Sequence, residues 1–207
     1  MINNPVPATH CIKLGGSLLR RNDVAERLPA WLEAIRAREP DENQVLIVGG
    51  GGAVEWLREL DRGAGLDPAA AHWAAIGMMD ANARAVAGWL PMAELTDAWP
   101  PAPSEPSGVC RLLMPGRFLR EVEPSLPRPT LPIRWSVTSD SIAARIASLL
   151  SARLTLVKSA DVETPTDGAG WRGLAEQGVV DACFADFVGG LSRVELTTLD
   201  RPPLRGA

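Results

Sequence analysis

The chain has 207 residues, of which 46% are hydrophobic and 22% charged, an ordinary globular composition that excludes a disordered chain. Its 21 basic and 25 acidic residues give a formal net charge of -4, which excludes the basic footprint of a nucleic acid-binding protein. The sequence shows no signal peptide pattern and no apolar run of about 18 residues. We therefore expect a cytoplasmic, soluble protein of one large domain or two closely packed lobes, without nucleic acid or membrane partners.

The predicted elements alternate between strands and helices. In the first half they are a strand at 11–14, a helix after a cap at Asp23, a strand at 44–48, and helices at 53–60 and 68–90. Two proline clusters, at 100–106 and 124–132, bracket a short strand at 109–114. The remaining elements are a helix carrying Ile142, Ile146 and Leu149, and strands at 154–157, 179–184 and 193–199. Such alternation predicts an α/β protein with a largely parallel central sheet.

Two glycine loops follow predicted strands. Gly15 and Gly16 with Ser17 follow the first strand, and four consecutive glycines, 49–52, follow the second. Glycines let backbone N–H groups approach an anion, and a helix that starts after the loop adds its positive end. A turn needed only for close strand-helix packing explains one or two glycines better than four, so the run favours an anionic ligand.

Common nucleotide motifs do not account for these loops. The Gly-x-Gly-x-x-Gly fingerprint fails, because Val54 or Glu55 stands where its third glycine belongs. A Walker A loop also fails, because no Gly-Lys-Ser or Gly-Lys-Thr occurs in the chain. Phosphate binding in this protein therefore requires a different scaffold.

Lysine is rare and is placed at strand ends. Of the 21 basic residues, 19 are arginine and only Lys13 and Lys158 are lysine. A compact ammonium charge fills a different role from a planar guanidinium, so both lysines are candidate ligand contacts, although chance placement of two residues stays an alternative. Asp140, at the start of a predicted helix, is either an ordinary first-turn carboxylate or the acid that holds the two lysines or touches magnesium.

The three cysteines, Cys11, Cys110 and Cys183, are odd in number and widely spaced, with no Cys-x-x-Cys or histidine cluster. They predict buried, reduced side chains and neither a disulfide framework nor a metal site.

Four segments in order, 13–17, 48–52, 140–144 and 156–163, resemble the amino acid kinase family, which includes acetylglutamate, aspartate, uridylate and isopentenyl phosphate kinases. The matched segments span roughly residues 11 to 165. The shortness of the chain and the helix between His72 and Ala83 are most similar to the small kinases of methanofuran biosynthesis, which phosphorylate an aminomethylfuran phosphate.

The resemblance implies an αβα sandwich, ATP and Mg2+ as cofactors, a small anionic substrate, and a homodimer or larger assembly. Residues 1–125 would form the acceptor-binding lobe and residues 133–207 the nucleotide-binding lobe of one kinase-like domain. The catalytic residues implied are Lys13, Asp140 and Lys158. The nucleotide-binding residues implied are Gly15, Gly16, Ser17, Ser159 and Asp161. The acceptor-binding residues implied are Gly49, Gly50, Gly51, Gly52, His72 and Asp80.

One departure affects these expectations. Many family members carry a late lysine after a Gly-Gly-Met segment, and residues 173–186 contain none. Lys158 is our candidate to supply that charge.

Two other classes of function stay open on the sequence. A nucleotide or oxyanion storage protein on the same fold would need the same glycine loops. A nicotinamide oxidoreductase is disfavoured by the failed fingerprint.

Overall fold

The computed structural model describes residues 8–101 and 108–201, and its central feature is one sheet of six strands in the order β3-β4-β2-β1-β5-β6. Every pairing between neighbouring strands is parallel. The strands are β1 (Thr9–Leu14), β2 (Asn43–Val48), β3 (Ala93–Thr96), β4 (Cys110–Leu113), β5 (Arg153–Val157) and β6 (Val194–Thr197). The predicted α/β sandwich with a parallel sheet is confirmed.

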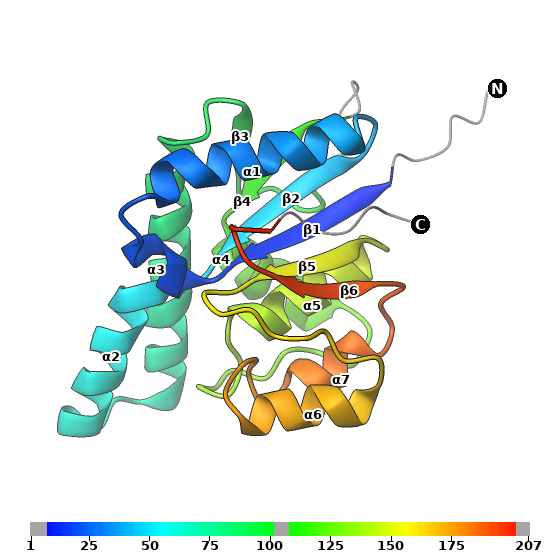
Figure 1. Ribbon diagram of the computed structural model, residues 1–207. Helices are drawn as coiled ribbons and strands as arrows, with labels where there is room; N and C mark the ends of the chain where they lie inside the picture. Colours follow the sequence, from blue (N-terminus) through cyan, green and yellow to red (C-terminus); the bar gives the residue numbers. More distant parts are fainter. Residues whose placement is uncertain (1–7, 102–107, 202–207) are drawn as a thin grey trace.

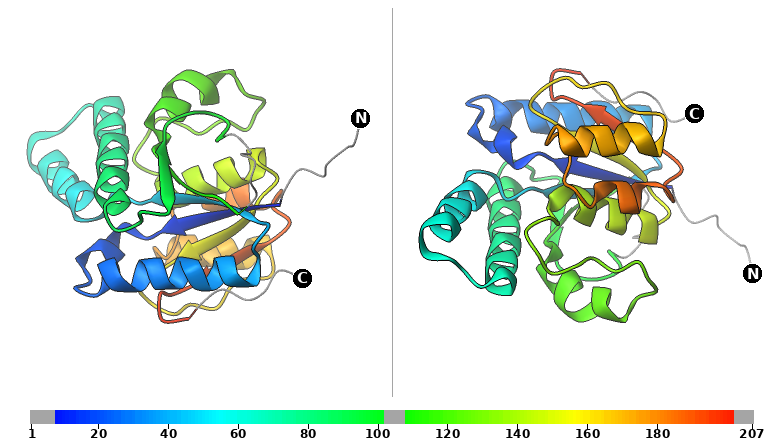
Figure 2. Two further views of the ribbon diagram at one scale, coloured as in Figure 1. Left: turned by 90° about the horizontal axis from the view of Figure 1, so that it is seen from above. Right: turned by 90° about the horizontal axis from the view of Figure 1, so that it is seen from below.

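Helices cover both faces of this sheet (Figure 1). The α-helices are α1 (Val24–Arg38), α2 (Gly51–Ala64), α3 (Pro68–Ala87), α4 (Pro115–Arg117), α5 (Ser139–Leu149), α6 (Gly168–Glu176) and α7 (Phe184–Val188). Short turns of other helical types are η1 (Gly16–Arg20), η2 (Phe118–Val122) and η3 (Glu123–Ser125). The two further views show α2 and α3 side by side, projecting beyond the sheet (Figure 2).

Two hydrophobic clusters lie between the sheet and its helices, one on each face of the sheet. Because side chains alternate along a strand, Ile12 and Leu14 of β1 pack with α1, whereas Cys11 packs with α5 on the opposite face. Lys13 lies on the same face as Cys11, toward α5 and its Asp140. The alternation along β1 therefore places Lys13 on the α5 side of the sheet, close to the edge at which the parallel strands end.

Several predicted elements differ in detail from the structure. The predicted strand at 179–184 is wrong: Gly178 turns the chain with a φ of 73°, and α7 begins at Phe184. Val180, Cys183 and Phe184 are buried by packing under α5 instead of by strand pairing, a distinction that a short apolar run does not make. Helix α1 is continuous and contains Pro29, and the sequence analysis missed β3, α6 and α7.

The cysteine prediction is confirmed, because Cys11, Cys110 and Cys183 are all buried and free. Part of the first proline cluster, residues 102–106, lies outside the described residues. Within the described part of the chain, no helix is both long and apolar enough to span a bilayer.

The two glycine loops touch each other through their backbones. A Cβ built on Gly16 would lie 2.1 Å from the backbone nitrogen of Gly51, and Gly51 itself has a φ of 59°. A Cβ on Gly49 would lie 2.8 Å from the backbone nitrogen of Gly16. Close packing of the loops therefore requires three of these glycines, independently of any ligand.

We expect Gly16→Ala to lower the free energy of unfolding by about 2 kcal/mol or more, because the loops must separate to admit the methyl group. Gly77→Ala is the matched control, since nothing lies within 4 Å of its Cβ position inside α3. That change should raise stability by about 0.5–1 kcal/mol. Urea denaturation of both variants measures the effects, and equal stability of the two would contradict the loop contact.

Candidate functional site

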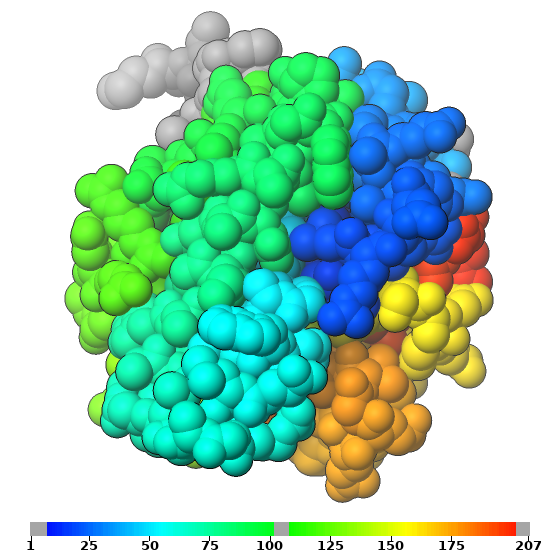
Figure 3. Space-filling view, turned by 90° about the vertical axis from the view of Figure 1, so that its left-hand side faces the viewer, coloured from blue at the N-terminus to red at the C-terminus, as the bar shows by residue number. Residues whose placement is uncertain are grey.

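The site lies at the carboxyl edge of the sheet, where ligands bind in open parallel sheets. The chain leaves β1 toward β2 on one side, and β5 lies on the other side of β1. Figure 3 shows this face, on which the start of α2 (cyan), the loop after β1 (blue) and the segment after β5 (yellow) converge. A cavity of about 820 Å³ opens there.

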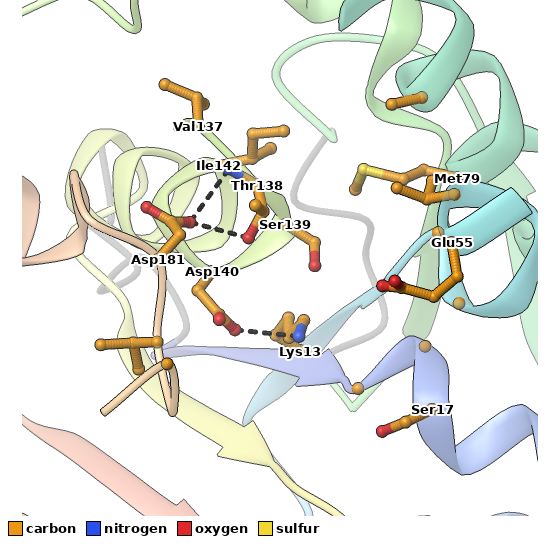
Figure 4. A pocket seen from close by; sticks show the side chains of 18 of the residues that line it. Lys13, Ser17, Glu55, Met79, Val137, Thr138, Ser139, Asp140, Ile142 and Asp181 are labelled. Atoms are coloured by element: carbon orange, nitrogen blue, oxygen red, sulfur yellow. Dashed lines mark hydrogen bonds and ion pairs between the residues drawn. The ribbon is translucent and has the colours of Figure 1, made fainter. Parts of the chain in front are cut away.

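Three charged side chains form the floor of this cavity, and we call Lys13, Asp140 and Lys158 the charged cluster. Lys13 Nζ lies 2.9 Å from Asp140 Oδ1, and Lys158 Nζ donates to both carboxylate oxygens at 2.9 Å. The exposed fractions of these side chains are only 6%, 8% and 13% in that order. Figure 4 shows Lys13 joined to Asp140 in the cavity. The structure thus brings together the three residues predicted to be catalytic.

Different elements hold the members of the charged cluster. Lys13 is on β1, where it pairs in register with Leu156 of β5. Lys158 follows the last residue of β5, and its backbone N–H donates to the Thr197 carbonyl of β6. Asp140 is in the first turn of α5, which packs on β1 and β5. The sheet register and one helix therefore determine the spacing of the three charges.

Burial and mutual attraction shift the titration of the charged cluster. Burial by itself would raise the pKa of Asp140, but the ammonium groups of Lys13 and Lys158 outweigh it and lower the pKa. For Lys158, burial and the positive charge of Lys13 lower the pKa to about 8, against the opposing attraction of Asp140 and Asp181. Asp140 is therefore ionised at neutral pH, and Lys158 loses its proton just above it.

The cavity has two differently lined halves. On one side the lining comes from α2, its preceding loop and α3: Gly50, Gly51, Gly52, Val54, Glu55, Arg58, His72, Ala75, Ile76 and Met79. The segment before α5 adds Trp135, Ser136 and Val137. On the other side it comes from residues after β5 and around 175–182: Ser159, Ala160, Val162, Ala175, Gly178, Val179, Val180, Asp181 and Ala182. Gly15, Gly16, Ser17 and Arg20 lie at the same cavity, on the loop after β1.

The glycine loops offer backbone donors to an anion. The first N–H groups of a helix lack partners within the helix, and those of α2 begin at Gly51 beside the cavity. Lys13, Lys158, Arg20 and Arg58 add positive charge to the same cavity. Such a surface can bind phosphate groups, although the loop contact, and not a ligand, already explains Gly16, Gly49 and Gly51.

His72 lines the cavity from α3 and is held in one tautomer. Its Nδ1 lies 3.3 Å from the carbonyl oxygen of Arg134, which only accepts, so Nδ1 carries the proton. Burial lowers the pKa of His72 below its ordinary value, despite the opposing effect of this hydrogen bond. The ring is therefore neutral at pH 7, with Nε2 as an acceptor.

The structure does not bring three of the predicted site residues to the cavity lining. Asp161 is exposed and pairs with Arg201 at 3.1 Å. Asp80 accepts from the backbone N–H of Gly116 at 3.1 Å and so ties α3 to α4. The Gly49 carbonyl accepts from Asn82 at 2.8 Å, beneath the loop. Their positions indicate structural contacts in place of the ligand contacts that we expected.

The sequence analysis missed Trp135 and Asp181. Trp135 donates from Nε1 to Asp61 Oδ2 at 2.8 Å and so links the segment before α5 to α2. Asp181 accepts from the backbone N–H groups of Thr138 and Ser141 at the start of α5. The partners in each pair are 40 or more residues apart in the sequence, so no local motif predicts either contact.

Within the described residues, no group of three or more His, Cys, Asp or Glu side chains is placed to hold a metal ion. Both oxygens of Asp140 already accept from lysines. The Asp140 carboxylate is therefore already engaged by the two lysines.

No family model and no curated protein matches the sequence. Solved structures do match. Uridylate kinase from Archaeoglobus fulgidus is 18% identical with a TM-score of 0.59, covering 92% of each chain. UMP kinase from Bacillus anthracis is 15% identical with a TM-score of 0.64, covering 96% of this chain and 90% of that one. UMP kinase from Ureaplasma parvum is 16% identical with a TM-score of 0.61, covering 95% and 91%. The chain therefore has the amino acid kinase fold of these UMP kinases.

Proposed function

We propose that this protein is an ATP-dependent phosphotransferase that moves the terminal phosphoryl group of ATP to a small anionic acceptor. The observation that carries the proposal is the charged cluster, two ammonium groups held on one carboxylate at the floor of a cavity with two halves. Phosphoryl transfer needs positioning and charge stabilisation more than covalent chemistry from the protein. The kinase names of the structures with the same fold agree with this assignment.

Different parts of the cavity would bind the nucleotide and the acceptor. The Gly15 to Ser17 loop and the lining after β5 would receive the nucleotide, and Gly50 to Gly52 with the α2 side would receive the acceptor. Lys13 and Lys158 would stabilise the charge that develops on the transferring group. Asp140 would keep both lysines in place, and magnesium would arrive on the nucleotide phosphates.

The reaction needs no general base when the acceptor is a phosphate monoester or a carboxylate. An anionic acceptor oxygen forms the new bond to phosphorus, and the bond from that phosphorus to the bridging oxygen breaks, so ADP leaves with the electron pair. A neutral His72, which is held by the Arg134 carbonyl, then acts as an acceptor of a hydrogen bond from the substrate.

The acceptor itself has two candidates. The aminomethylfuran phosphate suggested by the sequence resemblance has a compact ring, and the apolar lining by Val54, Ile76 and Met79 suits such a body. UMP is the acceptor named for the structures of the same fold. We favour the smaller and less polar acceptor, in a protein that we expect to be a homodimer or larger.

A screen with labelled ATP and magnesium decides between these acceptors and tests the proposal itself. We expect multiple turnovers with one phosphate or carboxylate acceptor and no phosphorylation of a sugar alcohol lacking an anionic group. Stoichiometric retention of nucleotide, with no acceptor turned over, would instead indicate a storage protein.

Lys13→Arg should lower turnover by about 10²- to 10³-fold, nearly as much as Lys13→Ala. The buried ammonium group fits between Asp140 and the cavity, and a planar guanidinium is too large for this place. Arg21→Ala is the control, because Arg21 pairs with Asp23 and Asp200 away from the cavity. Steady-state kinetics measure the losses. Retention of more than about a third of wild-type turnover by Lys13→Arg would refute the role of Lys13.

The pH dependence should reveal Lys158. As pH rises through about 8, Lys158 in the free enzyme loses its proton and its charge, so kcat/KM for ATP should fall. In Lys158→Arg the cation persists, and the descending limb near pH 8 should disappear even if the absolute rate is lower. If the descending limb is unchanged in Lys158→Arg, a group other than Lys158 is responsible for it.

Asp140→Asn should lower the free energy of unfolding by about 3 kcal/mol at pH 7, because two buried ammonium groups lose their counter-charge. The loss should be smaller at pH 9, since Lys158 is then largely neutral in both proteins; its pKa is about 8 with Asp140 and lower without it. Asp161→Asn, which breaks an exposed pair, serves as the control and should cost less than about 1 kcal/mol. Denaturation at pH 7 and pH 9 compares them, and a pH-independent loss would argue against the coupling.

A further inference from the structure

The segment 177–183, which we call the donor-side loop, is fastened to the charged cluster at two points. Lys158 Nζ donates to the Val179 carbonyl at 2.7 Å, in addition to its two bonds to Asp140. Two residues further along, Asp181 turns its carboxylate to the first turn of α5 (Figure 4). The donor-side loop therefore contacts both Lys158 and α5, the helix that carries Asp140.

The Asp181 carboxylate is fully engaged by donors at the start of α5. Its Oδ2 accepts from the Thr138 backbone N–H at 3.0 Å, from Thr138 Oγ1 at 2.9 Å and from the Ser141 backbone N–H at 2.9 Å. Its Oδ1 accepts from the Ser141 hydroxyl and from the Cys183 backbone N–H at 3.1 Å. Thr138 and Ser141 flank Asp140, so these bonds hold the turn on which Asp140 lies.

This arrangement also decides where an anion can bind. The amino end of a helix attracts negative charge, and three helical segments begin near the cavity. At α5 the carboxylate of Asp181 already occupies this end. Substrate phosphates are thereby directed to the glycine loops, and away from α5.

We propose that Asp181 is a positioning residue that fastens the donor-side loop to α5 and thereby sets the position of Asp140 and the two lysines. The inference deepens the proposed function, because it concerns the same charged cluster. Residues 173–186 carry no lysine, and the acid Asp181 in this stretch instead faces Lys158, which follows β5. Asp181 acts through Asp140 and Lys158, and is not itself placed in the catalytic step.

The chain offers a direct test, because Lys13 and Lys158 are its only lysines. Labelling lysine with 13C at Cε therefore yields two resonances in the NMR spectrum of the whole protein, and Lys13→Arg assigns them. The titration midpoint of Lys158 reports the charges that face it: Lys13 from β1, Asp140 from α5 and Asp181 from the donor-side loop. This readout requires no substrate and would not respond to a general loss of stability.

In Asp181→Asn we expect the Lys158 midpoint to fall by about half a pH unit or more, because the amide lacks the charge and places N–H groups against the donors of α5. Asp181→Glu should restore part of the shift. Asp186→Asn is the matched control, since Asp186 is exposed on α7, and it should leave the midpoint unchanged.

A second variant distinguishes the effect of the hydrogen bonds between Asp181 and α5 from the effect of the Asp181 charge. Thr138→Val combined with Ser141→Ala keeps the Asp181 carboxylate but removes two of its donors, and the midpoint should again fall as Asp140 loosens. If Asp181→Asn folds and its Lys158 midpoint equals that of the wild type, the proposal is overturned. If Asp181→Asn does not fold, the double variant decides, and a wild-type midpoint there overturns the proposal. Because lysine titration needs no turnover, an inactive wild-type protein would refute the phosphotransferase and leave this inference standing.

Discussion

The site depends on one electrostatic arrangement: a buried carboxylate shared by two ammonium groups. Asp140 neutralises only one of the two positive charges of Lys13 and Lys158, so the charged cluster keeps a net positive charge at neutral pH in a place with little solvent. Asp181 offsets part of this charge, and an anion bound in the cavity would offset the remaining charge of the cluster. The fold holds it at the carboxyl edge of the sheet, where the cavity admits such an anion.

The backbone around the charged cluster is built to keep this geometry. The loops after β1 and β2 touch through Gly16, Gly49 and Gly51, which brings the start of α2 next to Lys13. On the opposite side, Asp181 and the Val179 carbonyl tie the donor-side loop to α5 and Lys158. Contacts from both halves of the cavity therefore converge on the same three charges.

The glycine run shows how one pattern can have two causes. Four glycines in a row predict an anion-binding loop, because close strand-helix packing explains one or two glycines better than four. The structure shows that two of the four, Gly49 and Gly51, are needed for the contact with Gly16 of the other loop. The remaining argument for an anion rests on the charges and on the free end of α2, which a count of glycines does not reveal.

By itself the sequence determined the class of the fold, most strands and long helices, and the three residues of the charged cluster. Period-2 and period-3.6 patterns are local, and rare lysines at strand ends are visible in one dimension. Only the tertiary structure decided that residues 179–184 form a loop and not a strand, because a short apolar segment is buried equally well by either. It also decided that Asp80 and Asp161 serve structural contacts. The hydrogen bonds of Asp181 and Trp135 join residues far apart in the chain, and such pairings exist only once the sheet has placed them side by side.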